Sequence, residues 1–173
     1  MIPDKEFYFI RHGQTNYNKS LTKVDHADIS LNLTGKKQAI QCAPLIKKLP
    51  IQTICCSPLK RAKETKELLL PKSKHTESSD LGECTAQVWK EMTSLQSHAY
   101  TQGSSSVKEF LDRIQQGLNF ALKQQGPVLI VSHGGVHWGI CFWLQIRNHN
   151  WTVDNCLPVH FSMNEDTWIA KLL

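Results

Sequence analysis

The sequence lacks several features that would assign the protein to a class at once. No segment approaches the roughly 18 to 20 consecutive apolar residues of a membrane-spanning helix, and the first residues lack the basic start and apolar run of a secretory signal. The 6 cysteines form no CxxC pair, which argues against a zinc site. Basic and aromatic residues are not interleaved as they are on nucleic-acid-binding surfaces. These absences predict a cytoplasmic protein with reduced cysteines that binds neither membrane nor nucleic acid.

The bulk composition is that of an ordinary globular chain. Of the 173 residues, 40% are hydrophobic and 20% are charged, which is enough to bury a core without disulfides. We find no internal repeat, low-complexity segment or second-domain boundary, so the sequence predicts a single domain over residues 1–173. The net charge of +5 is compatible with weak attraction of anionic ligands. Nothing in the sequence indicates an oligomeric state.

Apolar segments alternate with segments of helical periodicity along the chain. We expect strands over residues 7–10, 51–56, 75–81 and 128–131, helices over residues 33–49, 58–70, 107–122 and 134–146, and a closing hairpin of Val159–Met163 and Trp168–Leu172. Pro44 should kink the first helix or shift its start. The segment 86–106 is polar, with a flexible turn over 103–106. This order predicts an α/β fold, a three-layer α/β/α sandwich with a mostly parallel central sheet and a C-terminal hairpin.

Polar side chains follow four of the expected strands. Parallel sheets bind ligands beyond the carboxyl ends of their strands, so these residues should meet at one edge. The candidates are two arginines, two histidines and one glutamate: Arg11 and His12 after the first strand, Arg61 after the second, Glu83 after the third and His133 after the fourth. A coincidence at four strand ends carries more weight than any one of these residues alone.

Two guanidiniums at one sheet edge indicate a phosphate site. Phosphoryl oxygens suit bidentate contacts with arginine, so Arg11 and Arg61 should hold the group from two sides. His133 precedes a helix whose N-terminal amides, from about Gly134, add affinity for anions. With this many fixed donors, neither a metal ion nor another cofactor is needed to offset the charge of the transition state.

The remaining two residues supply covalent and proton chemistry. A neutral histidine is a competent nucleophile near pH 7, and His12 at a sharp Arg-His-Gly turn is the better candidate for attack on phosphorus. Gly13 should allow a close approach of the backbone. Glu83 would protonate the leaving oxygen if its surroundings favour the acid form. Hydrolysis of the phosphohistidine by water would complete a phosphatase cycle.

These residues, in this order, resemble the histidine phosphatase superfamily, in its phosphoglycerate-mutase-like branch. The matching segments are RHGQTNYN (11–18), DISLNLTGKKQA (28–39), SPLKRAKET (57–65), LGECTAQVW (81–89), GSSSVKEFLDR (103–113) and SHGG (132–135). Gln87 stands where the family usually has glycine. The resemblance implies that His12 is phosphorylated, that Arg11, Arg61 and His133 form the phosphate pocket, that Asn18 assists, and that Glu83 donates the proton.

The resemblance also implies an activity. It favours a metal-independent phosphomonoesterase acting through a phosphohistidine on a small phosphorylated metabolite. Phosphoglycerate mutase-type transfer is the alternative, although true mutases of the family are longer, and only residues 86–106 offer room for a cover. The substrate would be set by loops around residues 20–29, 86–102 and 147–156. His137 lies one helical turn past His133 and is a candidate to support the His133 side chain.

Three further readings stay open. Cys55 and Arg61 have the C-x5-R spacing of cysteine-dependent phosphatases, although Pro58 removes one amide donor from that loop. A phosphate pocket that binds without turnover is the second. A metal hydrolase using His12 and His133 is the third, although the helix-spaced histidine pair of such enzymes is absent.

Overall fold

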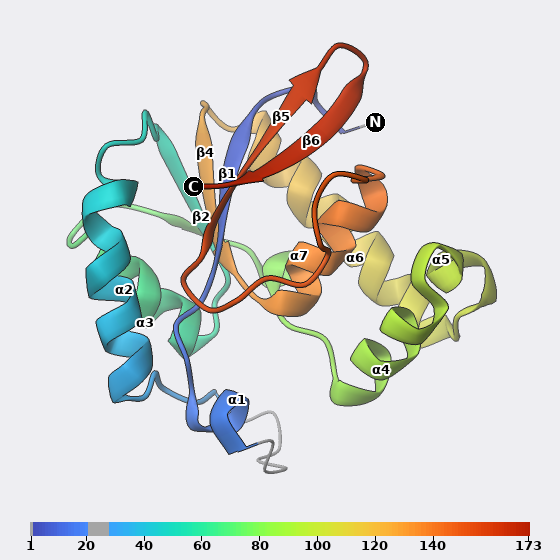
Figure 1. The fold of residues 1–173 in the computed structure, drawn as a ribbon, viewed down its shortest axis with the longest axis horizontal. Helices are drawn as coiled ribbons and strands as arrows, with labels where there is room; N and C mark the ends of the chain where they lie inside the picture. Colours follow the sequence, from blue (N-terminus) through green and yellow to red (C-terminus); the bar gives the residue numbers. More distant parts are fainter. Residues whose placement is uncertain (1, 21–27) are drawn as a thin grey trace.

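The computed structural model describes residues 2–20 and 28–173 of the chain and is built around a six-stranded sheet (Figure 1). The strands are β1 Phe7–Arg11, β2 Thr53–Cys56, β3 Thr76–Glu77, β4 Val128–Ser132, β5 Pro158–Asn164 and β6 Thr167–Leu172. The α-helices are α1 Asn16–Ser20, α2 Leu33–Ile46, α3 Lys60–Leu69, α4 Ala86–Leu95, α5 Ala99–Gln102, α6 Ser105–Lys123 and α7 Gly134–Trp143. Two 3₁₀ turns, η1 Ser79–Leu81 and η2 Gln96–His98, complete the elements.

The strand order is β3-β2-β4-β1-β5-β6. The first four of these strands are parallel to one another, whereas β5 runs antiparallel to β1, and β6 runs antiparallel to β5. The prediction of a mostly parallel sheet with a C-terminal hairpin is therefore confirmed. Arg11 pairs with Ser132, and Cys56 pairs with Val131, so β1, β2 and β4 end at the same edge.

Helices cover both faces of the sheet, with α2 and α3 on one side and α6 and α7 on the other (Figure 1). Successive strand residues point to opposite faces, so Phe7 and Phe9 join the cluster under α6 and α7, while Tyr8 and Ile10 join the cluster under α2 and α3. Phe7 also stacks on Phe161, with ring centroids 4.7 Å apart. Burial on both faces explains why β1 reads as a continuous apolar run rather than an alternating one.

The helix boundaries follow local signals. Asn32 caps α2 by accepting a hydrogen bond from the Gly35 amide at 2.8 Å, and Pro44 lies inside the last turn of that helix without shifting its start. In α6 the buried residues recur at the predicted helical spacing. The helix α7 ends at Trp143, three residues before the predicted boundary, and Gln145 adopts a left-handed backbone conformation with a φ of 52°. No helix of the described part of the chain is long and apolar enough to cross a membrane.

The strand predicted over residues 75–81 is wrong in length. Only Thr76 and Glu77 pair with β2, and both are exposed at the sheet edge. The Ser78 amide still donates to the Cys56 carbonyl at 3.0 Å, after which the chain turns into η1. The edge strand β3 therefore pairs over two residues and then leads into η1.

The polar segment 86–106, to which the sequence analysis assigned no helix or strand before residue 107, is largely helical. Thr85 caps α4 by accepting from the Val88 amide at 3.2 Å, and α4, η2 and α5 follow in succession. Val88, Met92 and Ala99 enter the core cluster shared with α6. Ser104 stands at the N-cap position of α6, so the expected flexible turn is a helix start.

Candidate active site

The first strand delivers Arg11 and His12 to the edge of the sheet. The His12 amide donates to the Ser132 carbonyl at 2.9 Å, and the Cys156 amide donates to the Arg11 carbonyl at 2.9 Å. Backbone hydrogen bonds therefore fix the end of β1 to β4 and to the segment before β5. Gly13 also makes room for a neighbouring segment of the chain. A Cβ at Gly13 would lie 2.5 Å from the Gly35 carbonyl oxygen, so the glycine admits the first turn of α2.

The hydrogen bonds of His12 define its protonation. Its Nδ1 lies 2.7 Å from the Gly13 carbonyl oxygen, which can only accept, so Nδ1 carries the proton. The Arg61 Nε–H donates to His12 Nε2 at 3.2 Å, so Nε2 presents a lone pair. Burial, together with the nearby Arg61 and Arg11 charges, lowers the pKa of His12 to about 3. The ring is therefore neutral at physiological pH, with its nucleophilic nitrogen directed at a guanidinium.

The two arginines approach from different elements. Arg11 donates through one terminal nitrogen to the Val153 carbonyl at 2.8 Å, while its Nε is buried with no hydrogen-bond partner among the described residues. Arg61 comes from the first turn of α3. Burial lowers the pKa of both guanidiniums, and the Glu83 charge opposes that shift in each. Both remain cationic at neutral pH, because arginine is not deprotonated in proteins.

The fourth strand brings His133 and the start of α7 to the same place. The His133 ring centroid lies 5.1 Å from that of His12. A Cβ at Gly134 would lie 3.4 Å from Arg11 Cζ, an ordinary van der Waals distance, so the guanidinium packs against the first turn of α7. Burial lowers the pKa of His133 well below its usual value, and the His12, Arg61 and Arg11 charges act in the same direction. His133 is thus a second neutral imidazole.

Glu83 reaches the site from the loop after η1. Its Oε1 accepts from the Gly135 amide at 3.0 Å and from the Cys84 amide at 3.0 Å. The loop itself is fixed by Arg113 of α6, which donates to the carbonyls of Ser79 and Glu83 at 2.9 and 3.4 Å. The carboxyl is therefore bound to the first turn of α7, the same turn that packs on Arg11.

The side chain of Asn18 is hydrogen-bonded within its own turn. It lies in α1, where its Oδ1 accepts from the Thr15 amide at 3.1 Å and from the Thr15 hydroxyl at 3.0 Å. This contact is that of a local turn, and a role for Asn18 in substrate binding stays a prediction. Residues 21–27 of the neighbouring predicted specificity loop lie outside the described residues.

The arrangement combines two half-buried guanidiniums with two buried, neutral imidazoles. Such a site attracts an anion with several oxygens, because each guanidinium offers a planar fork of donors. It also holds the neutral ring of His12, whose Nε2 lies 3.2 Å from Arg61 Nε. The five residues predicted from strand ends are therefore brought together at one edge of the sheet.

Comparison with known proteins agrees with this geometry. The sequence profile of the histidine phosphatase superfamily (branch 1) matches residues 7–173. The chain belongs to the histidine phosphatase superfamily. The uncharacterized phosphatase PhoE of Bacillus subtilis is 32% identical over 135 residues, which cover 72% of this chain and 69% of that protein.

A further curated relative is much longer than this chain, and a solved structure shares its fold. Agropine synthesis reductase of Rhizobium rhizogenes is 27% identical over 191 residues, which cover 97% of this chain but only 42% of that protein. The chain therefore spans less than half the length of that curated relative. The solved structure of a mycobacterial glucosyl-3-phosphoglycerate phosphatase with VO3 has a TM-score of 0.74 at 20% identity, covering 97% of this chain and 98% of that one.

Sequence reasoning missed several residues of this histidine phosphatase site. The Asn155 side chain donates to the His12 carbonyl at 2.7 Å, and the Thr65 hydroxyl accepts from the Gly13 amide at 3.0 Å. The Ser57 Oγ lies 2.7 Å from His133 Nε2. Ser57 and Thr65 stand at the two ends of the SPLKRAKET segment, so the motif already contained both residues. Their contacts could not be predicted, because they depend on how the strands pair.

The structure also bears on the two alternative catalytic mechanisms, a Cys55 thiolate and a metal hydrolase. Cys55 is fully buried in the core cluster under α6 and α7, and burial raises the pKa of its thiol to about 11. A thiolate nucleophile is therefore disfavoured at neutral pH. Among the residues that the structure describes, no group of three or more histidine, cysteine or acidic side chains is placed to hold a metal ion.

His137 does not support His133 through its side chain. Its Nδ1 lies 2.9 Å from the Trp151 carbonyl oxygen, to which it donates, and the ring packs against Phe9 and Phe161. Burial lowers the pKa of His137 to about 4. It is a neutral core residue on the face of the sheet covered by α7.

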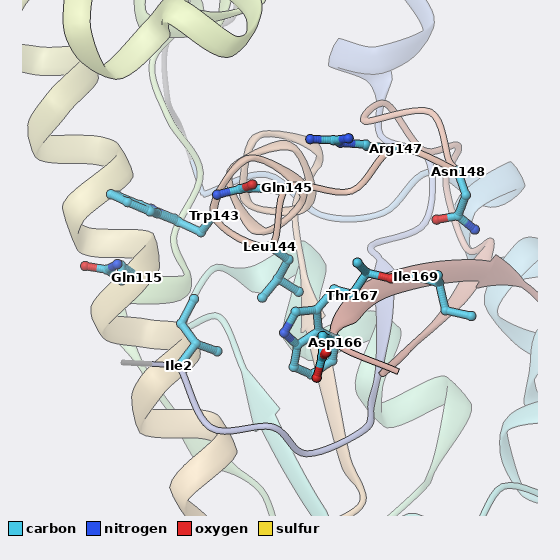
Figure 2. Close-up of a pocket in the computed structure, with 11 residues that line it drawn as sticks. Ile2, Gln115, Trp143, Leu144, Gln145, Arg147, Asn148, Asp166, Thr167 and Ile169 are labelled. Carbon is cyan, nitrogen blue, oxygen red and sulfur yellow. The ribbon is translucent and has the colours of Figure 1, made fainter. Parts of the chain in front are cut away.

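A separate hollow of about 680 Å³ lies at the other end of the sheet. Figure 2 shows it between α6 and the β5–β6 hairpin, with Gln115 on the helix side and Thr167 on the hairpin side. Because β5 is antiparallel to β1 and pairs Phe161 with Phe7, the hairpin turn lies beyond the first residue of β1. None of the predicted site residues lines this hollow.

Proposed function

We propose that the protein is a metal-independent phosphomonoesterase that acts on a small phosphorylated metabolite through a phosphohistidine at His12. The observation that carries the proposal is the hydrogen-bonding of His12, which directs an unprotonated Nε2 at the Arg61 guanidinium. A guanidinium also binds phosphoryl oxygens. The nucleophile and the phosphate-binding group therefore share one spot.

In the first step, the Arg61 Nε–H leaves His12 Nε2 for a phosphoryl oxygen. The freed lone pair of Nε2 then attacks phosphorus in line with the ester oxygen. The N–P bond forms as the P–O bond to the alcohol breaks, and Nδ1 keeps its proton on the Gly13 carbonyl. Arg11 and Arg61 neutralise charge on the phosphoryl oxygens from two sides. The first-turn amides of α7 favour an anion there as well.

Glu83 supplies the proton that the leaving alkoxide requires. Its Oε1 is occupied by the amides of Cys84 and Gly135, so we assign the proton transfer to Oε2. In the second step the Glu83 carboxylate accepts a proton from water, whose oxygen attacks the phosphohistidine. The N–P bond then breaks, and inorganic phosphate leaves with His12 again neutral.

Several observations support hydrolysis of a small ester over mutase transfer. The relative with 32% identity is named a phosphatase. Within the segment 86–106, which offered room for a cover, α4 and α5 pack against α6 through Val88, Met92 and Ala99.

The six free cysteines, several with thiols whose pKa is raised by burial, fit a reducing compartment such as the cytoplasm.

The test is a panel of phosphate esters assayed between pH 5 and 8, with EDTA present in a parallel series. We expect turnover of at least one small ester, resistance to EDTA, and loss of about 10³-fold or more in kcat for His12→Ala. No turnover of any ester, combined with protection against heat by phosphate or vanadate, would instead favour a pocket that only binds. Loss of activity in EDTA that is restored by a divalent cation would contradict the metal-independent route.

A further inference from the structure

Ser57 is a buried serine that touches the site without having been assigned a role in it. It follows β2 directly, and its amide donates to the Val131 carbonyl of β4 at 3.0 Å, so it extends the pairing of the two strands. Its side chain is fully buried. Because β2 and β4 are parallel neighbours, the residue after one strand meets the residue after the other, and Ser57 Oγ lies 2.7 Å from His133 Nε2.

The direction of this hydrogen bond depends on where the hydrogen of the hydroxyl goes. The Leu59 amide donates to Ser57 Oγ at 3.3 Å, which leaves the oxygen a second lone pair, but the one hydrogen of the hydroxyl needs an acceptor. Within the described parts of the chain, His133 Nε2 is the acceptor in reach of that hydrogen. The Ser57 hydroxyl therefore donates to His133 Nε2, and in the neutral ring the proton must sit on Nδ1.

The Nδ1–H of His133 then has no acceptor among the described residues. It is buried and has no hydrogen-bond partner among residues 2–20 and 28–173. A buried donor without an acceptor is costly, and such groups are rare unless a ligand completes them. Arg11 Nε, in the same site, is a second buried donor without a partner. Two orphaned donors in one pocket indicate an incoming ligand with at least two acceptor atoms.

We propose that Ser57 fixes the tautomer of His133, so that His133 presents an N–H donor, and not a lone pair, to the phosphoryl group. The proposal rests on the proposed function of the site. The two imidazoles then carry their proton on the same ring atom but show opposite chemistry to the substrate. His12 offers the Nε2 lone pair that attacks, and His133 offers the Nδ1–H that binds a phosphoryl oxygen. With the other tautomer, a lone pair of His133 would face the anionic oxygens and repel them.

The direct test is spectroscopic and does not require turnover. In protein labelled with ¹⁵N-histidine, two-bond ¹H–¹⁵N correlation spectra identify which ring nitrogen of His133 is protonated, with the signal assigned by its loss in His133→Gln. We expect the Nδ1–H form in the wild type and a shift towards the Nε2–H form in Ser57→Ala. Ser57→Thr, which keeps the hydroxyl, should retain the Nδ1–H form.

A matched control is available at the end of the neighbouring strand. Ser132 is equally buried, but its hydroxyl donates to the Leu81 carbonyl at 2.7 Å, so Ser132→Ala removes a buried hydroxyl without touching the His133 ring. We expect the His133 tautomer to be unchanged in this variant. An Nε2–H tautomer in the wild type would overturn the proposal, whether or not Ser57→Ala folds. An unchanged tautomer in folded Ser57→Ala would overturn it as well.

Kinetics separate this inference from the proposed function. In Ser57→Ala we expect the inhibition constant of inorganic phosphate to rise, and kcat/KM to fall, by about 10- to 100-fold, as for loss of one hydrogen bond to a charged group. Absence of any phosphohistidine in the wild type would refute the proposed chemistry but leave the tautomer result standing. Full activity and phosphate affinity in a Ser57→Ala protein that has changed tautomer would refute the link between tautomer and phosphate binding.

Discussion

The buried neutral histidines should make the fold sensitive to acid, and His137 allows the size of this effect to be worked out. Its ring is fully buried, and burial lowers its pKa from 6.5 to about 4. As the pH falls, the unfolded chain binds the proton first, so the stability present above pH 6.5 is lost progressively towards pH 4. Between pH 7 and pH 5 this one residue should reduce the free energy of unfolding by about 2 kcal/mol.

The perturbation is His137→Gln, which removes the titrating ring and keeps a donor for the Trp151 carbonyl. Urea unfolding at pH 5, 6 and 7 gives the free energy of unfolding of both proteins. The variant should lose about 1 to 3 kcal/mol at every pH from poorer packing, but its curve should be flatter than that of the wild type by about 2 kcal/mol between pH 7 and pH 5. Parallel curves would refute the reasoning, because His137 would then not titrate differently in the two states.

Three further substitutions test the site and its frame. In Gly135→Ala the new Cβ would collide with Glu83 Oε1 and with Cys84 Sγ, so kcat per folded molecule should fall by about 10-fold or more and the free energy of unfolding in urea by about 1 to 3 kcal/mol; an unchanged kcat would contradict the role given to Glu83. In Arg113→Met the carbonyls of the Glu83 loop lose their donor, so both kcat and the melting temperature should fall, and an unaltered kcat would remove Arg113 from the positioning of Glu83. In Cys55→Ser the activity per folded molecule should stay within about twofold, and its loss would revive the thiolate mechanism.

The layered fold could be predicted because its strands are short apolar runs between helices of clear periodicity. Residues 7–10 and 128–131 could be placed in a buried sheet because each is a wholly apolar run too short for a buried helix, as expected of a strand covered on both faces. The third strand could not be predicted at its true length. Its two residues are exposed and polar, so their pairing depends on the neighbouring β2 and not on a pattern of their own.

The segment 86–102 was missed for a related reason. Its helices bury only a few side chains, such as Val88, Met92 and Ala99, among polar neighbours, and such a sparse pattern does not stand out from a loop. Packing against α6 supplies the stability that the local sequence does not indicate.

For the candidate site, too, the sequence predicted which residues meet but not the hydrogen bonds between them. Arg11, His12, Arg61, Glu83 and His133 could be predicted to meet because parallel strands end together. The hydrogen bonds that set their protonation could not, since they depend on register and rotamer. The bond from Arg61 to His12 joins residues 49 apart in the chain, and that from Ser57 to His133 joins residues 76 apart.

The central claim is that the unprotonated Nε2 of His12 becomes covalently phosphorylated during turnover. Its most direct test is to mix the protein with its best ester, quench in alkali within one turnover, and map the phosphoryl group by mass spectrometry. The account predicts a phosphoryl group on His12 that survives base, is lost in acid, and is absent in His12→Ala. A phosphoryl group on any other residue, or wild-type turnover by His12→Ala, would contradict it.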